Sequence, residues 1–220
     1  MNIKLKGDIK ILPKKSIDLL PGFTVLIGCN GAGKTTLIDS LYTTCRKMDN
    51  VVCLAYNDRS DGGSLLISEF MCKGRMSDAA DMTFSSEGER IVIGLTQFLH
   101  KVKKALEDNP GKDVVILYDA VDSGMSLDVV KEFKQYNYQL LENLKKHRKE
   151  VYIVVAANSY GMCKDELCFD VSSWQDYYEL TYDDFETVID KSRIRKDKRN
   201  KKLYEAENRK QGQKVSERKS

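Results

Sequence analysis

The chain has 220 residues, of which 41% are hydrophobic and 31% are charged, with a formal net charge of +3. This length and composition predict one soluble globular domain with a substantial core. No apolar run approaches the roughly 18 residues that a membrane span needs, and no signal-peptide segment is present, so we expect a cytoplasmic protein without membrane segments.

The N-terminal part of the chain changes from alternating to continuously apolar patterns. Residues 3–20 alternate apolar and polar side chains and predict antiparallel strands around a turn at residues 12–15. A buried strand is expected at residues 23–27, a helix at 36–47 and a second buried strand at 51–56.

The remainder of the chain alternates helical and strand patterns. A helix is indicated at residues 65–72, and apolar positions at i, i+3, i+4 and i+7 predict a strong one over 91–106. Ser126 is the expected N-cap of a further helix ending near residue 146. Strands are predicted at 114–118, 151–157 and 167–171, with a short edge piece at 178–180 and a basic helix from Tyr182 onward. The pattern predicts an α/β domain with N-terminal antiparallel strands and a mostly parallel central sheet flanked by helices.

A glycine-rich segment connects the first buried strand to the first helix. Residues 28–36 read Gly-Cys-Asn-Gly-Ala-Gly-Lys-Thr-Thr and match the phosphate-loop pattern G-x-x-x-x-G-K-[ST]. The glycines allow backbone N–H groups to point at phosphate oxygens, and the start of the helix adds positive potential. Lys34 would reach the β- and γ-phosphates, and the Thr35 hydroxyl would bind Mg²⁺. The predicted nucleotide-binding residues are Gly28, Cys29, Asn30, Gly31, Ala32, Gly33, Lys34, Thr35 and Thr36.

Two further segments suit a nucleotide site. The apolar strand 114–118 is followed by Asp119, a carboxylate placed to hold Mg²⁺ through its water shell. Residues 85–90 combine hydroxyls, a glycine and a helix start, which suits an anion. The same segment also fits a simple capping box, with Ser86 as N-cap and Glu89 three residues later. Its position between the phosphate loop and Asp119 favours the anion site.

The three segments together resemble motifs of the ABC superfamily of ATPases. Residues 28–36 resemble its Walker A, and residues 86–90 resemble the S-x-G-[EQ]-[KR] form of its signature. Residues 119–126 are similar to the Walker B and D-loop of chromosome-maintenance and RecF-like DNA-repair head ATPases. The resemblance implies a P-loop NTPase of the ABC-head type with ATP and Mg²⁺ as cofactors. We expect residues 1–190 to form this domain and residues 191–220 to form a basic C-terminal tail.

The resemblance also implies an ATP-sandwich homodimer. Ser86 and Gly88 of one copy would contact the γ-phosphate held by Lys34 of the other, while Asp122 and Ser123 would lie across the interface. The residues to which it assigns catalysis are Lys34, Asp119 and Asp122, and those to which it assigns Mg²⁺ are Thr35 and Asp119.

Three positions depart from the family pattern. Ala120 stands where the catalytic Glu is expected, and Asn158 or Ser159 stands near the place of the switch His. No Gln follows the strand 51–56, where Asn57 is a poor substitute. Loss of a positioned general base costs about 10²–10⁴ in rate. We therefore expect slow hydrolysis, in an ATP-driven dimerisation switch of the DNA-repair or genome-defence kind.

Two alternative functions fit the phosphate loop alone. One is the nucleotide-binding subunit of a membrane transporter. The missing His and Gln disfavour it, as does the interval of 52 positions between Lys34 and Ser86, which leaves little room for a helical subdomain. The other is a P-loop kinase or small GTPase. The absence of an N-K-x-D motif disfavours it, and it would leave the signature-like segment without a role.

Charge is unevenly distributed along the chain. Residues 191–220 contain 13 Lys or Arg and 4 Asp or Glu, whereas the other 190 residues contain 23 and 29. This asymmetry points to a nucleic acid or an effector protein as the partner of the tail, and a tail that is merely solvated fits as well. The six cysteines include no C-x-x-C pair, which predicts reduced thiols.

Overall fold

A mostly parallel sheet forms the centre of the chain in the computed structural model, which describes residues 1–7, 9–57, 71–74, 76–77, 87–122, 125–146 and 150–217. The chain begins with three strands, and strands and helices then largely alternate. In chain order they are β1 Asn2–Lys4, β2 Ser16–Asp18, β3 Gly22–Ile27, α1 Lys34–Cys45, β4 Val51–Asn57, α5 Glu87–Glu107, β5 Asp113–Asp119, α6 Leu127–Lys145, β6 Val151–Ala156, α7 Tyr160–Cys163, β7 Leu167–Asp170, β8 Gln175–Tyr177 and α8 Tyr182–Glu217.

The order of strands in the sheet brings together the carboxyl ends of strands that lead into polar loops. Within the described residues the central sheet runs β4-β5-β6-β3-β7-β8, with all neighbours parallel except β7 and β8. Strand β6 thus lies between β3, which leads into the glycine-rich loop, and β5, which ends at Asp119. Because the carboxyl ends of parallel strands share one edge, the loops after β3, β5, β6 and β7 gather there.

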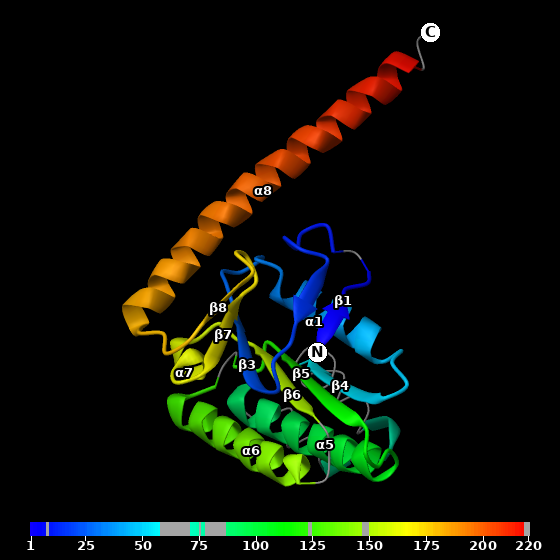
Figure 1. Cartoon of the computed structure of the whole chain (residues 1–220), viewed down its shortest axis with the longest axis vertical. Coiled ribbons are helices and arrows are strands. Elements are labelled where there is room, and N and C mark those ends of the chain that lie inside the picture. Colours follow the sequence, from blue (N-terminus) through cyan, green and yellow to red (C-terminus); the bar gives the residue numbers. More distant parts are fainter. Residues whose placement is uncertain are drawn as a thin grey trace.

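Both faces of the sheet are covered, which explains the continuous apolar runs of its inner strands. Helices α5 and α6 lie side by side across one face, and α1 with the β1–β2 pair lies on the other (Figure 1). On the α5–α6 face, Tyr118 makes ring contacts with Phe98 and Phe133 at centroid distances of 5.6 and 5.0 Å. On the other face, Leu117 of β5 is in one buried cluster with Leu37 and Leu41 of α1.

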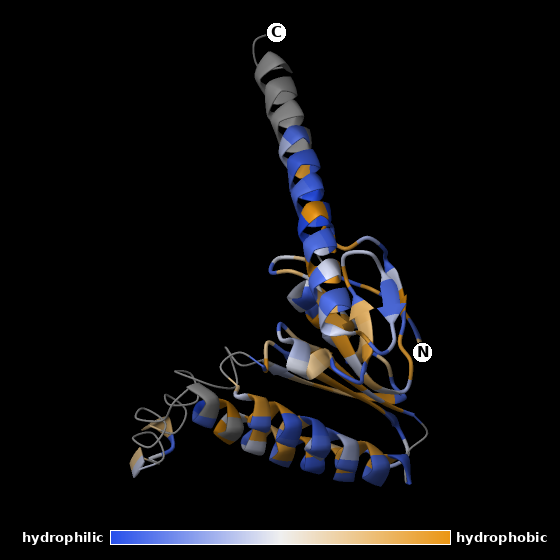
Figure 2. Ribbon diagram, turned by 90° about the vertical axis from the view of Figure 1, so that its left-hand side faces the viewer, coloured by the Kyte–Doolittle hydropathy of each residue, from blue (hydrophilic) through white to orange (hydrophobic). Residues whose placement is uncertain are grey.

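Helix α8 is continuous from Tyr182 to Glu217, so residue 190 falls inside a helix and not at a break. Its first turns are attached to the core through Phe185 and Val188, which are buried. The helix contacts the body as far as Arg199. Beyond that residue it projects from the body (Figure 1), and the residues coloured along it are mainly hydrophilic (Figure 2).

The structure confirms the α/β class, the mostly parallel sheet and the N-terminal antiparallel pair. The N-terminal strands are shorter than predicted, because residues 9–12 form a turn closed by the Leu12 N–H on the Ile9 carbonyl. The predicted strand at 178–180 is wrong. Strand β8 ends at Tyr177, and Glu179 has a left-handed backbone with φ of 53°. The prediction of a helix over 65–72 falls largely outside the described residues.

The structure also bears on the expectations about membrane segments and cysteines. None of the helices in the described part of the chain is long and apolar enough to cross a membrane. All six cysteines are free thiols.

We predict that Ile116→Ala destabilises the fold strongly. Ile116 is fully buried in β5, so its truncation leaves a cavity that costs about 2–5 kcal/mol of unfolding free energy. Chemical denaturation measures the change. As a control, Lys103→Ala on the exposed side of α5 should change stability by no more than about 0.5 kcal/mol. Equal effects of the two substitutions would contradict the placement of β5 in the centre of the sheet.

Candidate functional site: a donor-lined loop beside Asp119

The glycine-rich loop, residues 28–33, owes its shape to three glycines in left-handed conformations. Gly28, Gly31 and Gly33 have φ of 141°, 77° and 117°. A Cβ on Gly33 would stand 3.0 Å from Leu12, so the N-terminal segment packs directly on the loop. Gly33 is also the residue before α1, and the helix has no side-chain cap there. The first N–H groups of α1 are therefore not satisfied by a capping side chain.

Every backbone carbonyl of this loop accepts a hydrogen bond. The Cys29 carbonyl accepts from the Ala32 N–H within the loop, and the Gly33 carbonyl accepts from the Leu37 N–H of α1. Cationic side chains bind the others. Lys34 donates to Gly28, Lys196 to Asn30, and the Arg199 guanidinium to both Gly31 and Ala32, over distances of 2.6 to 3.3 Å.

Unlike the carbonyls, most N–H groups of the same segment have no hydrogen-bond partner within the described residues. Cys29 donates to the Ser192 hydroxyl at 3.1 Å, and Ala32 donates within the loop. Among the described residues, no group accepts a hydrogen bond from the remaining N–H groups of the loop and the first helical turn, which are those of Asn30, Gly31, Gly33, Lys34, Thr35 and Thr36. A run of free N–H groups at a helix N-terminus is an arrangement that suits an anion.

The side chains predicted for Mg²⁺ lie together at the end of this run. The Thr35 hydroxyl donates to Oδ1 of Asp119 at 3.2 Å. Thr35 lies in the first turn of α1 and Asp119 ends β5, so the contact joins two residues separated by 84 positions. Asp119 is almost completely buried, whereas Thr35 is exposed. A hydroxyl and a carboxylate offer oxygen ligands of the kind that a hard cation takes.

The electrostatic environment of Lys34 links the loop to two carboxylates. Burial lowers the pKa of Lys34 below its usual value, and the carboxylates of Asp122 and Asp119 offset part of that shift. The lysine is half-buried and stays close to the loop through its bond to Gly28. Its charge is therefore held beside the free N–H groups.

Asp122 connects the loop after β5 to the loop after β6. Its Oδ2 accepts from the N–H groups of Asn158 and Ser159 at 2.8 and 2.7 Å. Its Oδ1 is buried and has no partner within the described residues. Ser159 is the residue before α7, so Asp122 fixes the segment that leads into this short helix. The expectation that Asp122 lies across a dimer interface stays a prediction, as the residue is buried in the single chain.

Ala120 lies between these two carboxylates with a left-handed backbone, φ 55°. An L-residue in that region carries strain of about 1–3 kcal/mol. The chain therefore turns sharply after Asp119, which allows Asp119 to bind Thr35 while Asp122 reaches β6. No carboxylate at position 120 can activate water.

The other predicted site residues are only partly described. Ser86 and Ser123 lie outside the described residues, and Gly88 belongs to the first turn of α5. Asn57 ends β4 and pairs in register with Asp119. Their predicted roles toward a second copy's nucleotide stay predictions.

Helix α8 supplies site residues that sequence reasoning missed. Ser192, Lys196 and Arg199 all bind the glycine-rich loop. The same helix is fixed by Arg195, which binds the fully buried Asp170, the last residue of β7, at 3.1 Å. A signal was present in the sequence, because positions 192, 195, 196 and 199 share one helical face. We interpreted the segment by its charge alone.

Comparisons with known proteins add little to this site. No protein-family model and no curated protein matches the chain. One solved structure, described as the crystal structure of Stu0660 of Streptococcus thermophilus, is similar to this chain. The match covers 82% of this chain and 76% of that protein, with 10% sequence identity and a TM-score of 0.46. This likeness is too distant to assign a function.

We predict that Gly28→Ala destabilises the chain more than Gly111→Ala. Both glycines have positive φ, but a Cβ on Gly28 would meet Ala32 at 3.0 Å and Ser192 at 3.2 Å, whereas nothing lies within 4 Å at Gly111. The expected difference in unfolding free energy is about 1 kcal/mol or more. Thermal and chemical denaturation of the two variants measure it. A smaller loss for Gly28→Ala would show that α8 does not pack against the loop as described.

Proposed function

We propose that this chain binds Mg²⁺-ATP at the glycine-rich loop and acts as an ATP-dependent dimerisation switch with slow hydrolysis. One observation carries the proposal: within the described residues, six N–H groups without an acceptor belong to the segment that also carries Lys34 and the Thr35–Asp119 contact. Phosphates accept from backbone N–H groups, and a Mg²⁺ ion needs hard oxygen ligands next to them.

Each residue has a distinct part in nucleotide binding. The loop N–H groups would donate hydrogen bonds to the phosphate oxygens, and the dipole of α1 would add positive potential at its N-terminus. Lys34 would exchange its bond to the Gly28 carbonyl for a phosphate oxygen, because a charged acceptor binds an ammonium group more strongly than a carbonyl does. Thr35 would bind the metal directly, and Asp119 would hold its water shell. The preference for ATP over GTP rests on the ABC resemblance.

The expected hydrolysis is slow because the described residues place no evident general base at the loop. Ala120 has no polar group, and the Asp122 carboxylate already accepts two backbone N–H groups. Its unpartnered Oδ1 makes Asp122 the remaining acidic candidate close to Lys34. A protein that binds ATP tightly and hydrolyses it slowly suits a switch better than a cycling motor.

The homodimer is the part of the proposal that rests on resemblance. In a sandwich arrangement the signature-like segment with Ser86 and Gly88 would cover the phosphates of the second copy. This reading favours a role in a DNA-related or defence complex over a transporter subunit or a phosphotransferase, for the sequence reasons given above.

We predict that Lys34→Ala abolishes binding of Mg²⁺-ATP. The substitution removes the ammonium group that would bind the β- and γ-phosphates, so isothermal titration calorimetry should detect no binding. Lys47→Ala, two residues beyond the end of α1 and exposed, is the matched control and should retain the affinity. If Lys34→Ala binds ATP as tightly as the intact chain, the loop is not the nucleotide site.

We predict that Ala120→Glu raises ATP turnover by about tenfold or more, because a positioned general base contributes about 10²–10⁴ in rate. The unmodified chain should turn over well below the roughly 1–10³ s⁻¹ of typical enzymes. Since alanine already adopts the left-handed conformation there, glutamate adds little further backbone strain. Steady-state phosphate release measures both chains. Turnover of several per second by the unmodified chain would contradict this assignment, and loss of that turnover in Asp122→Asn would then identify Asp122 as the base.

A further inference from the structure

The two helices that cover one face of the sheet enclose a pocket between them. This α5–α6 pocket has a volume of about 260 Å³ and lies on the face of the sheet opposite α1 (Figure 1). Its floor is buried and consists of Leu95 of α5, Tyr118 of β5, and Phe133 and Asn137 of α6. Mostly apolar pockets with a few convergent polar groups are where proteins bind small ligands.

The floor of the pocket contains an unsatisfied hydrogen-bond acceptor. Asn137 is completely buried, and its Nδ2 donates to the Phe133 carbonyl of the preceding helical turn at 2.8 Å. Its Oδ1 is buried and has no partner within the described residues. A buried acceptor without a donor costs free energy. Because Nδ2 is turned back to the helix backbone, Oδ1 lies on the other side of the amide, where an N–H group of a ligand would satisfy it.

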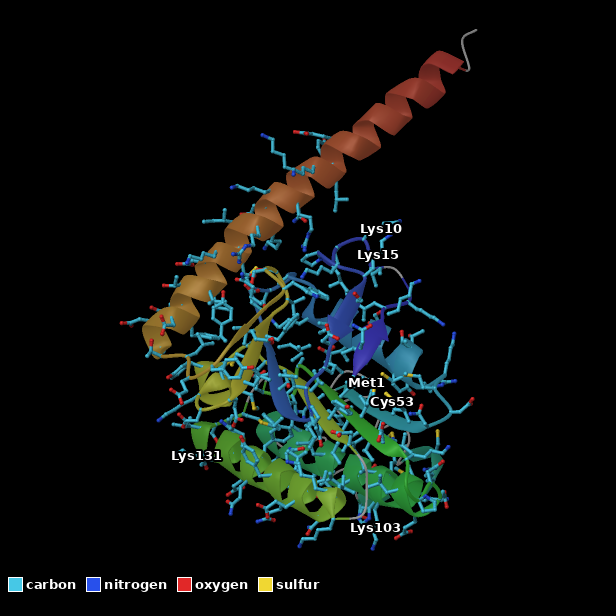
Figure 3. All side chains as sticks on the ribbon, in the orientation of Figure 1. Met1, Lys10, Lys15, Cys53, Lys103 and Lys131 are labelled. Carbon is cyan, nitrogen blue, oxygen red and sulfur yellow. The ribbon has the colours of Figure 1, made fainter. Side chains whose placement is uncertain are left out.

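The mouth of the pocket carries a negative charge. Glu132 and Tyr136 line it, are exposed, and lie one helical turn apart on α6. No lysine or arginine stands three or four positions from Glu132 on this helix, whereas Asp128 does. Lys103 of α5 and Lys131 of α6 lie on the same helical layer (Figure 3), but neither lines the pocket. The charged group at the mouth is therefore a carboxylate, which favours a cationic ligand.

Aromatic rings form much of the pocket wall. Tyr118 contacts Phe133 edge to face at a centroid distance of 5.0 Å, and Tyr136 adds a third ring at the mouth. Aromatic ligands pack well on such rings, and a cation over the face of a tyrosine is stabilised further. An apolar cavity of roughly 150 Å³ takes benzene, so the larger volume here accommodates a body of two fused rings.

We propose that the α5–α6 pocket binds a small aromatic amine. The ring system lies on Tyr118 and Phe133, a ring N–H donates to Oδ1 of Asn137, and the ammonium group lies between Glu132 and Tyr136. This inference goes beyond the proposed nucleotide function and does not depend on it, because none of these residues belongs to the glycine-rich loop or its metal ligands.

The first experiment tests the chemistry of the ligand with three indoles. Tryptamine, an indole ring with a protonated ethylamine, is the probe, and isothermal titration calorimetry with the full chain should show saturable binding. 1-Methyltryptamine lacks the ring N–H and should bind about 3–10-fold more weakly, which is the usual net contribution of one hydrogen bond. Indole-3-acetate carries a negative charge on the same ring and should bind about fivefold more weakly or less, because its carboxylate would lie beside Glu132.

Substitutions in α6 assign these preferences to residues. Asn137→Leu removes the acceptor with little change of volume, so tryptamine and 1-methyltryptamine should bind equally. Glu132→Gln should weaken tryptamine binding by about two- to fivefold and reduce the discrimination against indole-3-acetate. Glu142→Gln removes the same charge from an exposed position of α6 outside the pocket and should change neither. Since Glu132 is exposed, its variant tests the proposal even where Asn137→Leu does not fold.

The second experiment locates the ligand by amide chemical shifts in NMR spectra of the full chain. Tryptamine should perturb residues 95–99 and 129–137 and leave residues 28–36 unchanged. Perturbations confined to other parts of the chain would overturn the proposal, as would absence of saturable binding at the solubility limit of tryptamine. Equal affinities of the three indoles would mean non-specific apolar binding and would overturn it as well. None of these outcomes bears on whether the glycine-rich loop binds ATP.

Discussion

The hydrogen bonds of the glycine-rich loop are segregated, and the rest of the site depends on this segregation. All six carbonyls of residues 28–33 accept bonds, mostly from lysine and arginine side chains. The free N–H groups on the same segment have to face elsewhere, since a peptide unit directs its N–H away from its C=O. The proposed anion site follows from the way the carbonyls are bound, and we expect it to be weaker without the cations of α8.

The sheet topology brings the chemistry to this loop. Strand β6 lies between β3 and β5, so the segments after three neighbouring strands meet at one edge. Asp119 reaches Thr35 from β5, and Asp122 reaches back to the residues after β6. The sharp left-handed turn at Ala120 separates these two carboxylates. The same turn leaves an alanine where a catalytic acid would stand, which is why the account favours binding over rapid turnover.

Sequence reasoning predicted the parts of the site that depend on local pattern. The Lys34–Thr35 pair and Asp119 were found because each sits at a fixed offset from an apolar strand, and the structure places Thr35 and Asp119 in contact. The contribution of α8 was missed because it depends on where the chain returns after β8. Charge alone could not show that Arg199 binds loop carbonyls while its neighbours Lys198 and Lys202 are exposed. Asp170 carried the same signal as Asp119, an acid after an apolar strand, and its partner Arg195 was hidden in the basic segment.

A crystal structure of the full chain with Mg²⁺ and a non-hydrolysable ATP analogue tests the central claim most directly. The account predicts phosphate oxygens within hydrogen-bonding distance of the N–H groups of Gly31, Gly33 and Lys34. It also predicts a metal ion about 2.0–2.1 Å from the Thr35 hydroxyl, with Asp119 in its water shell. Nucleotide bound away from the loop, or a loop that still binds no anion at saturating analogue, would contradict it.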